Sequence, residues 1–234
     1  MYRKEVHQRS PLRIFEGSAR GGLGRGNLGA VISRAGVGKS AFLVNVALDE
    51  LMADRRVLHV AAGSPLDRVR NFYDKTFNEL LRSACVTDTA FLRLSMERNR
   101  HIHCFAPGSF RTGSLYDEAL SLRDHADFRP DLIILDDFPF ESAVERDMED
   151  LRRLATEFQA EAWLAALSHR HETPPDGGVH DPTQAFDAYL SVKLFLEPAG
   201  DRVKLRVLKD HENPDPAALT VDLDPSTLLI RNGD

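Results

Sequence analysis

The sequence has few of the features that stabilise secreted or membrane proteins. Only two of its 234 residues are cysteines, Cys85 and Cys104. Their spacing matches no metal-binding motif, so we expect two reduced thiols in a cytoplasmic protein. No apolar run approaches the roughly 18–20 residues of a membrane span, and the basic N-terminus has no apolar stretch typical of a secretory leader. We therefore expect neither a disulfide scaffold nor a membrane anchor.

An excess of positive charge is also missing. The chain has 36 acidic against 30 basic residues, which gives a net charge of −6 and does not favour nucleic-acid binding by the whole surface. A local basic channel in an oligomer is still compatible with this balance. The hydrophobic content of 42% and the charged content of 28% are typical of a soluble globular domain. The length is sufficient for one large α/β domain.

Short apolar runs alternate with helical patterns over most of the chain. This alternation predicts a mostly parallel sheet with helices on both faces, because buried parallel strands read as continuous apolar runs. Three further strand-like runs follow residue 187, and we expect them to form an antiparallel extension of the same sheet. We divide the chain into an irregular, basic segment 1–27 and one nucleotide-binding domain 28–234. The expected strands are 28–32, 57–62, 101–106, 131–137 and 162–167, and the expected helices include 39–52, 113–127 and one that begins with Ser64 as its cap.

The stretch VISRAGVGKSAFL, residues 31–43, is close to the phosphate-binding pattern G-x-x-x-x-G-K-[ST]. Ser33 stands at the first glycine of that pattern, while the final Gly-Lys-Ser is intact. Consecutive backbone N–H groups of such a loop bind phosphates, the lysine contacts the β- and γ-phosphates, and the Ser40 hydroxyl is a ligand for Mg²⁺. The predicted ATP-binding residues are Arg34, Ala35, Gly36, Val37, Gly38, Lys39, Ser40 and Ala41.

An acidic pair closes the apolar run 132–135. Asp136 lies at the end of a predicted strand, where a carboxylate can support the same Mg²⁺ from the side opposite the loop. Ser40 and Asp136 are therefore the predicted metal residues. ATP and Mg²⁺ are the predicted cofactors.

Together these motifs resemble the RecA-like P-loop ATPases, in particular the branch of the KaiC, RadA-type and DnaB-type proteins. The resemblance covers about residues 12–230. It implies a γ-phosphate sensor at Ser168 and His169, and a role for Lys209 at the nucleotide of a neighbouring subunit, with His211 where the family has an arginine. It also implies a homo-oligomer or a protein partner. The stretches that carry it are GGLGRGNLGAVIS, VLHVAAGSPLDRV, DLIILDD, AWLAALSHR and RVKLRVLKDHE.

The sequence departs from this family at the water-activating acid. Gly63 stands at the end of the second strand, where the resemblance implies a glutamate, and Asp137 is the substitute catalytic residue that we predict. A positioned carboxylate contributes about 10²–10⁴ in rate, so we expect ATP binding with slow turnover. The alternatives are a regulatory or scaffolding module that binds nucleotide without turnover, and a P-loop phosphotransferase with residues 170–182 as a lid.

Two further patterns point to other ligands. Nine histidines include His101 and His103, which alternate on one predicted strand, but a metal site needs three or four convergent ligands and spacing alone does not supply them. The segment 169–182 resembles the DNA-facing loop of RecA-like proteins, yet it mixes one arginine with three acids and holds no aromatic residue. For this segment we favour contact with a protein partner, or simple flexibility, over binding of nucleic acid.

Overall fold

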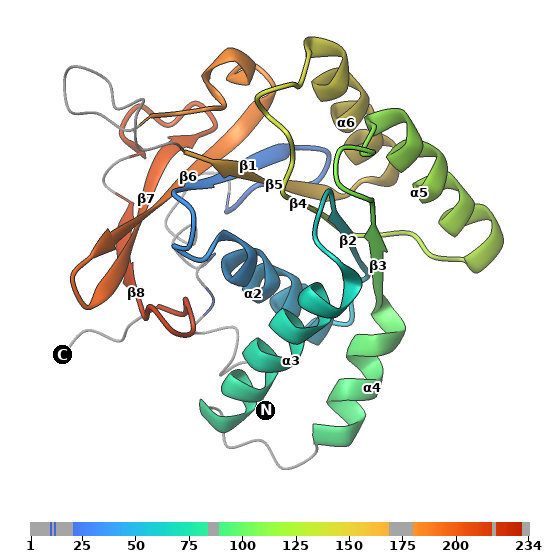
Figure 1. Ribbon diagram of the computed structural model, residues 1–234, viewed down its shortest axis with the longest axis horizontal. Coiled ribbons are helices and arrows are strands. Elements are labelled where there is room, and N and C mark those ends of the chain that lie inside the picture. Colours follow the sequence, from blue (N-terminus) through green and yellow to red (C-terminus); the bar gives the residue numbers. More distant parts are fainter. Residues whose placement is uncertain are drawn as a thin grey trace.

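A computed structural model describes residues 10, 12, 21–83, 89–168, 180–216 and 219–230. Within this part of the chain, one eight-stranded sheet has the order β3-β2-β4-β5-β1-β6-β7-β8 (Figure 1). Most of the expected segment 1–27 lies outside the described residues. The strands are β1 Leu28–Ser33, β2 Val57–Ala61, β3 Arg100–Cys104, β4 Leu132–Asp136, β5 Glu161–Leu167, β6 Leu190–Ala199, β7 Arg202–Asp210 and β8 Thr220–Leu223.

The first six strands of this order run parallel, and the last two pair antiparallel. β6, β7 and β8 pair antiparallel with one another, which confirms the expected antiparallel extension, and β6 joins the rest of the sheet by parallel pairing with β1. Strand direction is set by the crossover between β5 and β6 and not by the apolar pattern of the strand itself.

Helices cover both faces of the sheet (Figure 1). The apolar side chains alternate along each strand, so that Val31 belongs to the core under one set of helices and Ile32 to the core under the other. This confirms the predicted α/β class. Helices α2 Lys39–Met52, α3 Leu66–Ser83 and α4 Thr89–Asn99 pack on one face, whereas α5 Thr112–Ala126 and α6 Glu145–Phe158 pack on the other, and the short 3₁₀ helix η3 Gln184–Phe186 precedes β6.

The C-terminal strand and the turn after it brace the phosphate-loop helix. The Asn45 amide of α2 donates a hydrogen bond of 2.7 Å to the Thr227 carbonyl. A Cβ atom placed on Gly38 would lie 2.7 Å from Cδ1 of Leu228, which is a closer approach than any side chain tolerates. The end of the domain therefore fixes the position of the loop at its beginning.

Two local features differ from the expectations. Helix α4 was not expected, and its apolar residues do not form one stripe, because Phe91 and Leu94 are 67% and 70% exposed while Met96 is buried. Helix α3 begins at Leu66, and the Ser64 hydroxyl donates to Asp137. No described helix combines the length and the apolar character that crossing a bilayer requires.

Candidate nucleotide site

The loop between β1 and α2 contains the residues predicted to bind phosphate. Gly36 and Gly38 adopt φ angles of 79° and 117°, which glycine reaches without the strain that a side chain would add. Gly38 caps α2 without a side-chain hydrogen bond, and the first turn of this helix contains no acidic residue. The N–H groups and the positive end of the helix dipole are therefore available to an anion.

Lys39 folds back over the loop. Its Nζ donates to the carbonyl of Ser33 at 3.1 Å and to the Ser33 hydroxyl at 3.4 Å. Burial lowers the pKa of Lys39, whereas the nearby charges of Asp136 and Asp137 raise it. Ser33, which stands at the first glycine position of the motif, therefore contacts the lysine of the same motif, Lys39.

The side chains predicted to hold Mg²⁺ lie in contact. The Ser40 side chain is near enough to the Asp136 carboxylate to influence its pKa, and Asp136 is 4% exposed at the end of β4. Burial raises the pKa of Asp136 to about 6, and the Ser40 hydrogen bond opposes this rise. A hydroxyl and a carboxylate are the hard oxygen ligands that Mg²⁺ prefers, and a buried acid with a raised pKa gains from a nearby cation. These residues therefore fit the expected ion.

Asp137 projects from the next position into solvent. Its φ of 59° is in the left-handed region, which aspartate tolerates better than most residues. Its Oδ2 accepts a hydrogen bond of 2.9 Å from the Ser64 hydroxyl, which reaches across from the end of β2. The strands pair Ala61 with Asp136, so the segments beyond their ends meet at the same edge. Gly63 has no heavy atom within 4 Å of an added Cβ.

A cleft of about 470 Å³ opens beside these residues. Its lining includes Lys39 and, from the segment that follows β4, Asp137, Phe138 and Phe140. Such a volume is in the range of small-molecule sites. Phe138 and Phe140 pack edge to face with ring centroids 4.7 Å apart.

The predicted γ-phosphate sensor is only partly described. Ser168 is 5% exposed, and its backbone N–H donates to the Ser33 carbonyl at 2.9 Å, so it borders the phosphate loop. Its hydroxyl donates to the His180 carbonyl at 2.8 Å. His169, together with most of the segment 169–182, lies outside the described residues.

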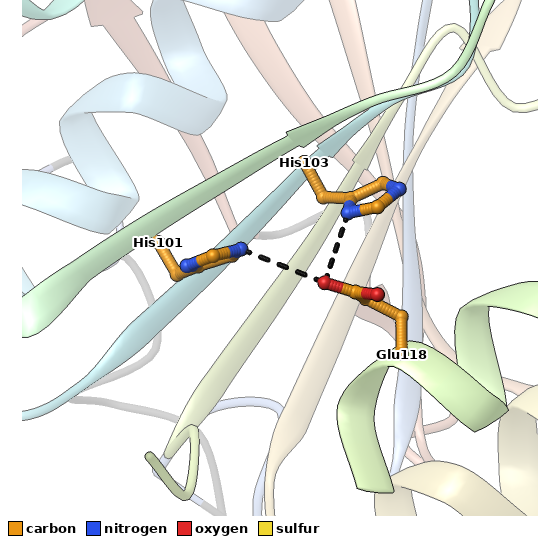
Figure 2. Close-up of side chains that lie close together, drawn as sticks. All are labelled: His101, His103 and Glu118. Atoms are coloured by element: carbon orange, nitrogen blue, oxygen red, sulfur yellow. Dashed lines mark ion pairs between the residues drawn. The ribbon is translucent and has the colours of Figure 1, made fainter. Parts of the chain in front are cut away.

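His101 and His103, which were considered as metal ligands, do not lie at this site. His101 and His103 lie on β3 beside Glu118 of α5 (Figure 2). β3 is separated from the phosphate-loop strand β1 by three strands of the sheet.

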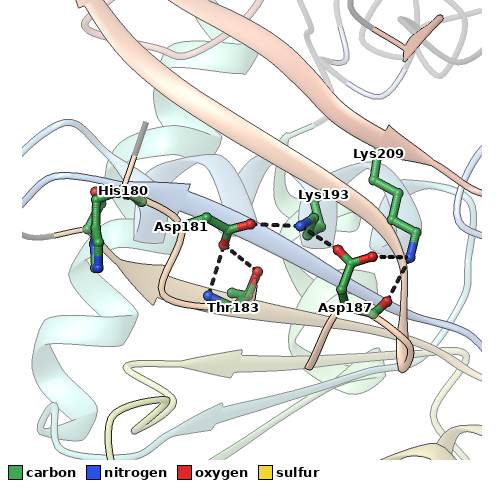
Figure 3. A network of polar contacts seen from close by, with 7 residues as sticks. His180, Asp181, Thr183, Asp187, Lys193 and Lys209 are labelled. Carbon is green, nitrogen blue, oxygen red and sulfur yellow. Dashed lines mark hydrogen bonds and ion pairs between the residues drawn. The ribbon is translucent and has the colours of Figure 1, made fainter. Parts of the chain in front are cut away.

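Lys209 lies on β7 in a network of charges that also involves β6 (Figure 3). Its Nζ lies 2.9 Å from Oδ2 of Asp187 and donates to the carbonyl of the same residue at 2.7 Å. Lys193 bridges the carboxylates of Asp187 and Asp181 at 2.5 and 2.7 Å. His211, where the family has an arginine, makes a hydrogen bond of 3.0 Å with the Gly22 carbonyl.

Sequence reasoning did not identify three partners of these residues. The local pattern predicts Ser64 as a helix cap, although its place three residues after Ala61 puts it at the same sheet edge as Asp137. Asp187 and Leu228 contact Lys209 and Gly38 only because distant segments pack together. Local sequence patterns hold no signal for such contacts.

The mostly parallel sheet with helices on both faces and antiparallel strands at its C-terminal end defines a RecA-like α/β fold. The chain is similar to a solved structure of an ATPase domain, with a TM-score of 0.69, 14% sequence identity, and coverage of 98% of this chain and 95% of that one. At this identity the likeness establishes the fold alone. Neither a protein-family model nor a curated protein sequence matches the chain.

Proposed function

We propose that the protein binds Mg²⁺-ATP at the loop before α2 and hydrolyses it slowly, in an oligomer of cytoplasmic subunits. The observation that carries this proposal is the convergence of three side chains on the glycine loop. Lys39, Ser40 and Asp136 meet there, with the helix N-terminus free of competing acids. A phosphate chain needs that combination of N–H donors, cation and metal ligands.

Each residue has a defined task in this proposal. The backbone N–H groups of residues 34–41 bind the phosphates, and Lys39 exchanges its bonds to Ser33 for phosphate oxygens. Ser40 and Asp136 hold Mg²⁺, which neutralises phosphate charge when it is bound. Asp137 orients the attacking water, and the Ser64 hydroxyl fixes the Asp137 carboxylate.

Slow turnover follows from two substitutions relative to the family that the sequence resembles, at Gly63 and at His211, and from the short side chain of Asp137. Gly63 provides no carboxylate at the end of β2, and an aspartate at position 137 is one methylene shorter than a glutamate. His211 makes an intrachain contact where the family has an arginine. A role for Lys209 at a neighbouring subunit requires that subunit's phosphates to replace its contact with Asp187.

A second function is favoured by one observation at the same site. The carboxylate of Asp137 is already hydrogen-bonded to Ser64, so it is less available to a water molecule. A protein with this arrangement would bind ATP without hydrolysing it and act as a regulatory or scaffolding module. Its partner would be a protein; nucleic acid stays an alternative that rests on the loop 169–182.

Turnover measurements separate the two functions. The purified chain is tested for ATP binding by calorimetry and for phosphate release, alongside Asp137→Asn. We expect wild-type hydrolysis above background and a loss of about 10²-fold in the variant, with binding retained. Asp127→Asn is the matched control, because Asp127 is exposed and also has a left-handed backbone, with φ of 47°. Binding with no wild-type turnover would support the regulatory module instead.

Assembly is tested separately by measuring the mass in solution with and without Mg²⁺-ATP. We expect an oligomer in at least the ATP-bound state. A monomer in both states would rule out the role of Lys209 between subunits but would leave nucleotide binding intact.

A further inference from the structure

Three side chains of metal-binding type meet at the edge of the sheet, far from the phosphate loop along the strand order. His101 and His103 lie two residues apart on β3, so both point to the face covered by α5. Glu118 projects from α5 between them (Figure 2). Its Oε1 lies 3.9 Å from His101 Nε2 and 3.2 Å from His103 Nδ1.

The distances are close to those of a metal site. The three ligand atoms all lie within 4.8 Å of one another. Tetrahedral zinc with ligands at about 2.0–2.1 Å requires its ligand atoms to be roughly 3.4 Å apart. The two pairs with Glu118 are already within about 0.5 Å of that value. The third pair, His101 with His103, lies within 4.8 Å and would have to close by at most about 1.4 Å, and all three side chains are only half-buried, with 28–36% exposure.

Both imidazole rings pack against aromatic side chains, which limits their movement at the edge of the sheet. The His101 ring lies against Phe128 with centroids 5.9 Å apart, and the His103 ring lies against Phe105 at 4.6 Å. Burial lowers the pKa of His101, and the charge of His103 lowers it further, while Glu118 raises it.

We propose that His101, His103 and Glu118 form a binding site for a divalent transition-metal ion of the zinc type. Two imidazole nitrogens and one carboxylate oxygen supply three protein ligands, and the solvent-facing side leaves a fourth position for water. A bound ion would join the edge strand β3 to helix α5. The site does not depend on nucleotide binding, because it shares no residue with the phosphate loop.

The test is a zinc titration of the tag-free chain after treatment with a chelator, in buffer without nucleotide or Mg²⁺. Competition with a chromophoric chelator gives stoichiometry and affinity. We expect one equivalent of Zn²⁺ per chain, and a weakening of at least about tenfold in each of His101→Ala, His103→Ala and Glu118→Gln. His125→Ala is the matched control, because His125 is an exposed histidine of the same helix, and it should bind Zn²⁺ as the wild type does.

A second readout separates loss of ligands from loss of fold. Co²⁺ bound in place of Zn²⁺ should give the visible absorption of a tetrahedral site, and Zn²⁺ should raise the melting temperature of the wild type but not of Glu118→Gln. Circular dichroism of the metal-free variants checks that they fold. The proposal is overturned if the wild type binds no Zn²⁺, or if His101→Ala/His103→Ala binds it as tightly as the wild type, which would assign binding to other histidines.

Discussion

The imidazole of His59 makes the stability of the domain depend on pH. This residue lies in β2 and is 1% exposed. Its Nδ1 makes a hydrogen bond of 3.1 Å with the Tyr73 hydroxyl, while its Nε2 has no hydrogen-bond partner among the described residues. Burial, and to a smaller extent the charge of Arg100, lowers the pKa of His59 to about 3.

The size of the effect follows from this shift. The unfolded chain binds a proton at His59 below its ordinary pKa of 6.5, whereas the native state stays neutral down to about 3. Stability from this group is therefore complete above pH 6.5 and falls by about 1.4 kcal/mol per pH unit below it. Between pH 7 and pH 5 the loss is about 2 kcal/mol. The raised pKa of Asp136 acts with the opposite sign, so a comparison with a His59 variant is needed.

The assay is urea unfolding of the wild type and His59→Gln, followed by circular dichroism at pH 7, 6 and 5. Glutamine does not titrate and keeps a group that can hydrogen-bond to Tyr73. We expect the free-energy difference between the two proteins to shift by about 2 kcal/mol in favour of the variant as the pH falls to 5. Parallel pH profiles for the two proteins would refute the reasoning.

Three substitutions in the nucleotide site have expected outcomes. Gly63→Glu restores the missing acid in open space and should raise ATP turnover by about 10²-fold, measured by phosphate release. Gly38→Ala places a Cβ against Leu228 in a left-handed backbone and should lower stability by about 1–3 kcal/mol in urea unfolding. Ser33→Gly should change ATP affinity by less than about threefold in calorimetry, because the shorter contact of Lys39 is to a carbonyl that glycine also has.

Control variants and alternative outcomes test the physical reason given for each of these three predictions. Gly63→Gln has the size of the glutamate without its charge, so equal activation by both would argue against a role for the carboxylate. Gly113→Ala lies in helix α5 with open space around it and should not destabilise the chain. If it costs as much as Gly38→Ala, the contact with Leu228 is not the cause. A large gain in affinity from Ser33→Gly would mean that the serine hydroxyl restrains Lys39.

The fold was largely predictable because buried elements leave local patterns. The helix predicted at 39–52 has the same bounds in the structure, and the bounds predicted for β1 to β5 agree with the structure to within one or two residues. Helix α4 was not predicted, because two of its apolar residues face solvent and weaken the helical periodicity of its apolar positions. The parallel pairing of β6 with β1 was not predicted, because it depends on where the preceding chain crosses the sheet.

The site was predictable where one short motif contains the residues. Gly36, Gly38, Lys39 and Ser40 all belong to the loop 33–40 and the start of α2, so one motif is enough to find them. Asp136 lies at the end of β4, as the sequence predicts. The hydrogen bond between Ser64 and Asp137 joins residues 73 positions apart. The local sequence predicts Ser64 as a helix cap and Asp137 as a catalytic acid, and neither prediction points to the other residue. Such contacts become visible only when the strand register is known.

The most direct test of the central claim is Mg²⁺-ATP binding by Lys39→Ala, measured by calorimetry against the wild type. Lysine bonds to phosphate are charge-assisted and contribute about 1.5–3 kcal/mol, which corresponds to roughly 10–100-fold in affinity. Lys75→Ala, which removes an exposed lysine of α3, is the control and should bind ATP as the wild type does. We predict at least about tenfold weaker binding for Lys39→Ala; an unchanged affinity would contradict the assignment of this loop as the nucleotide site.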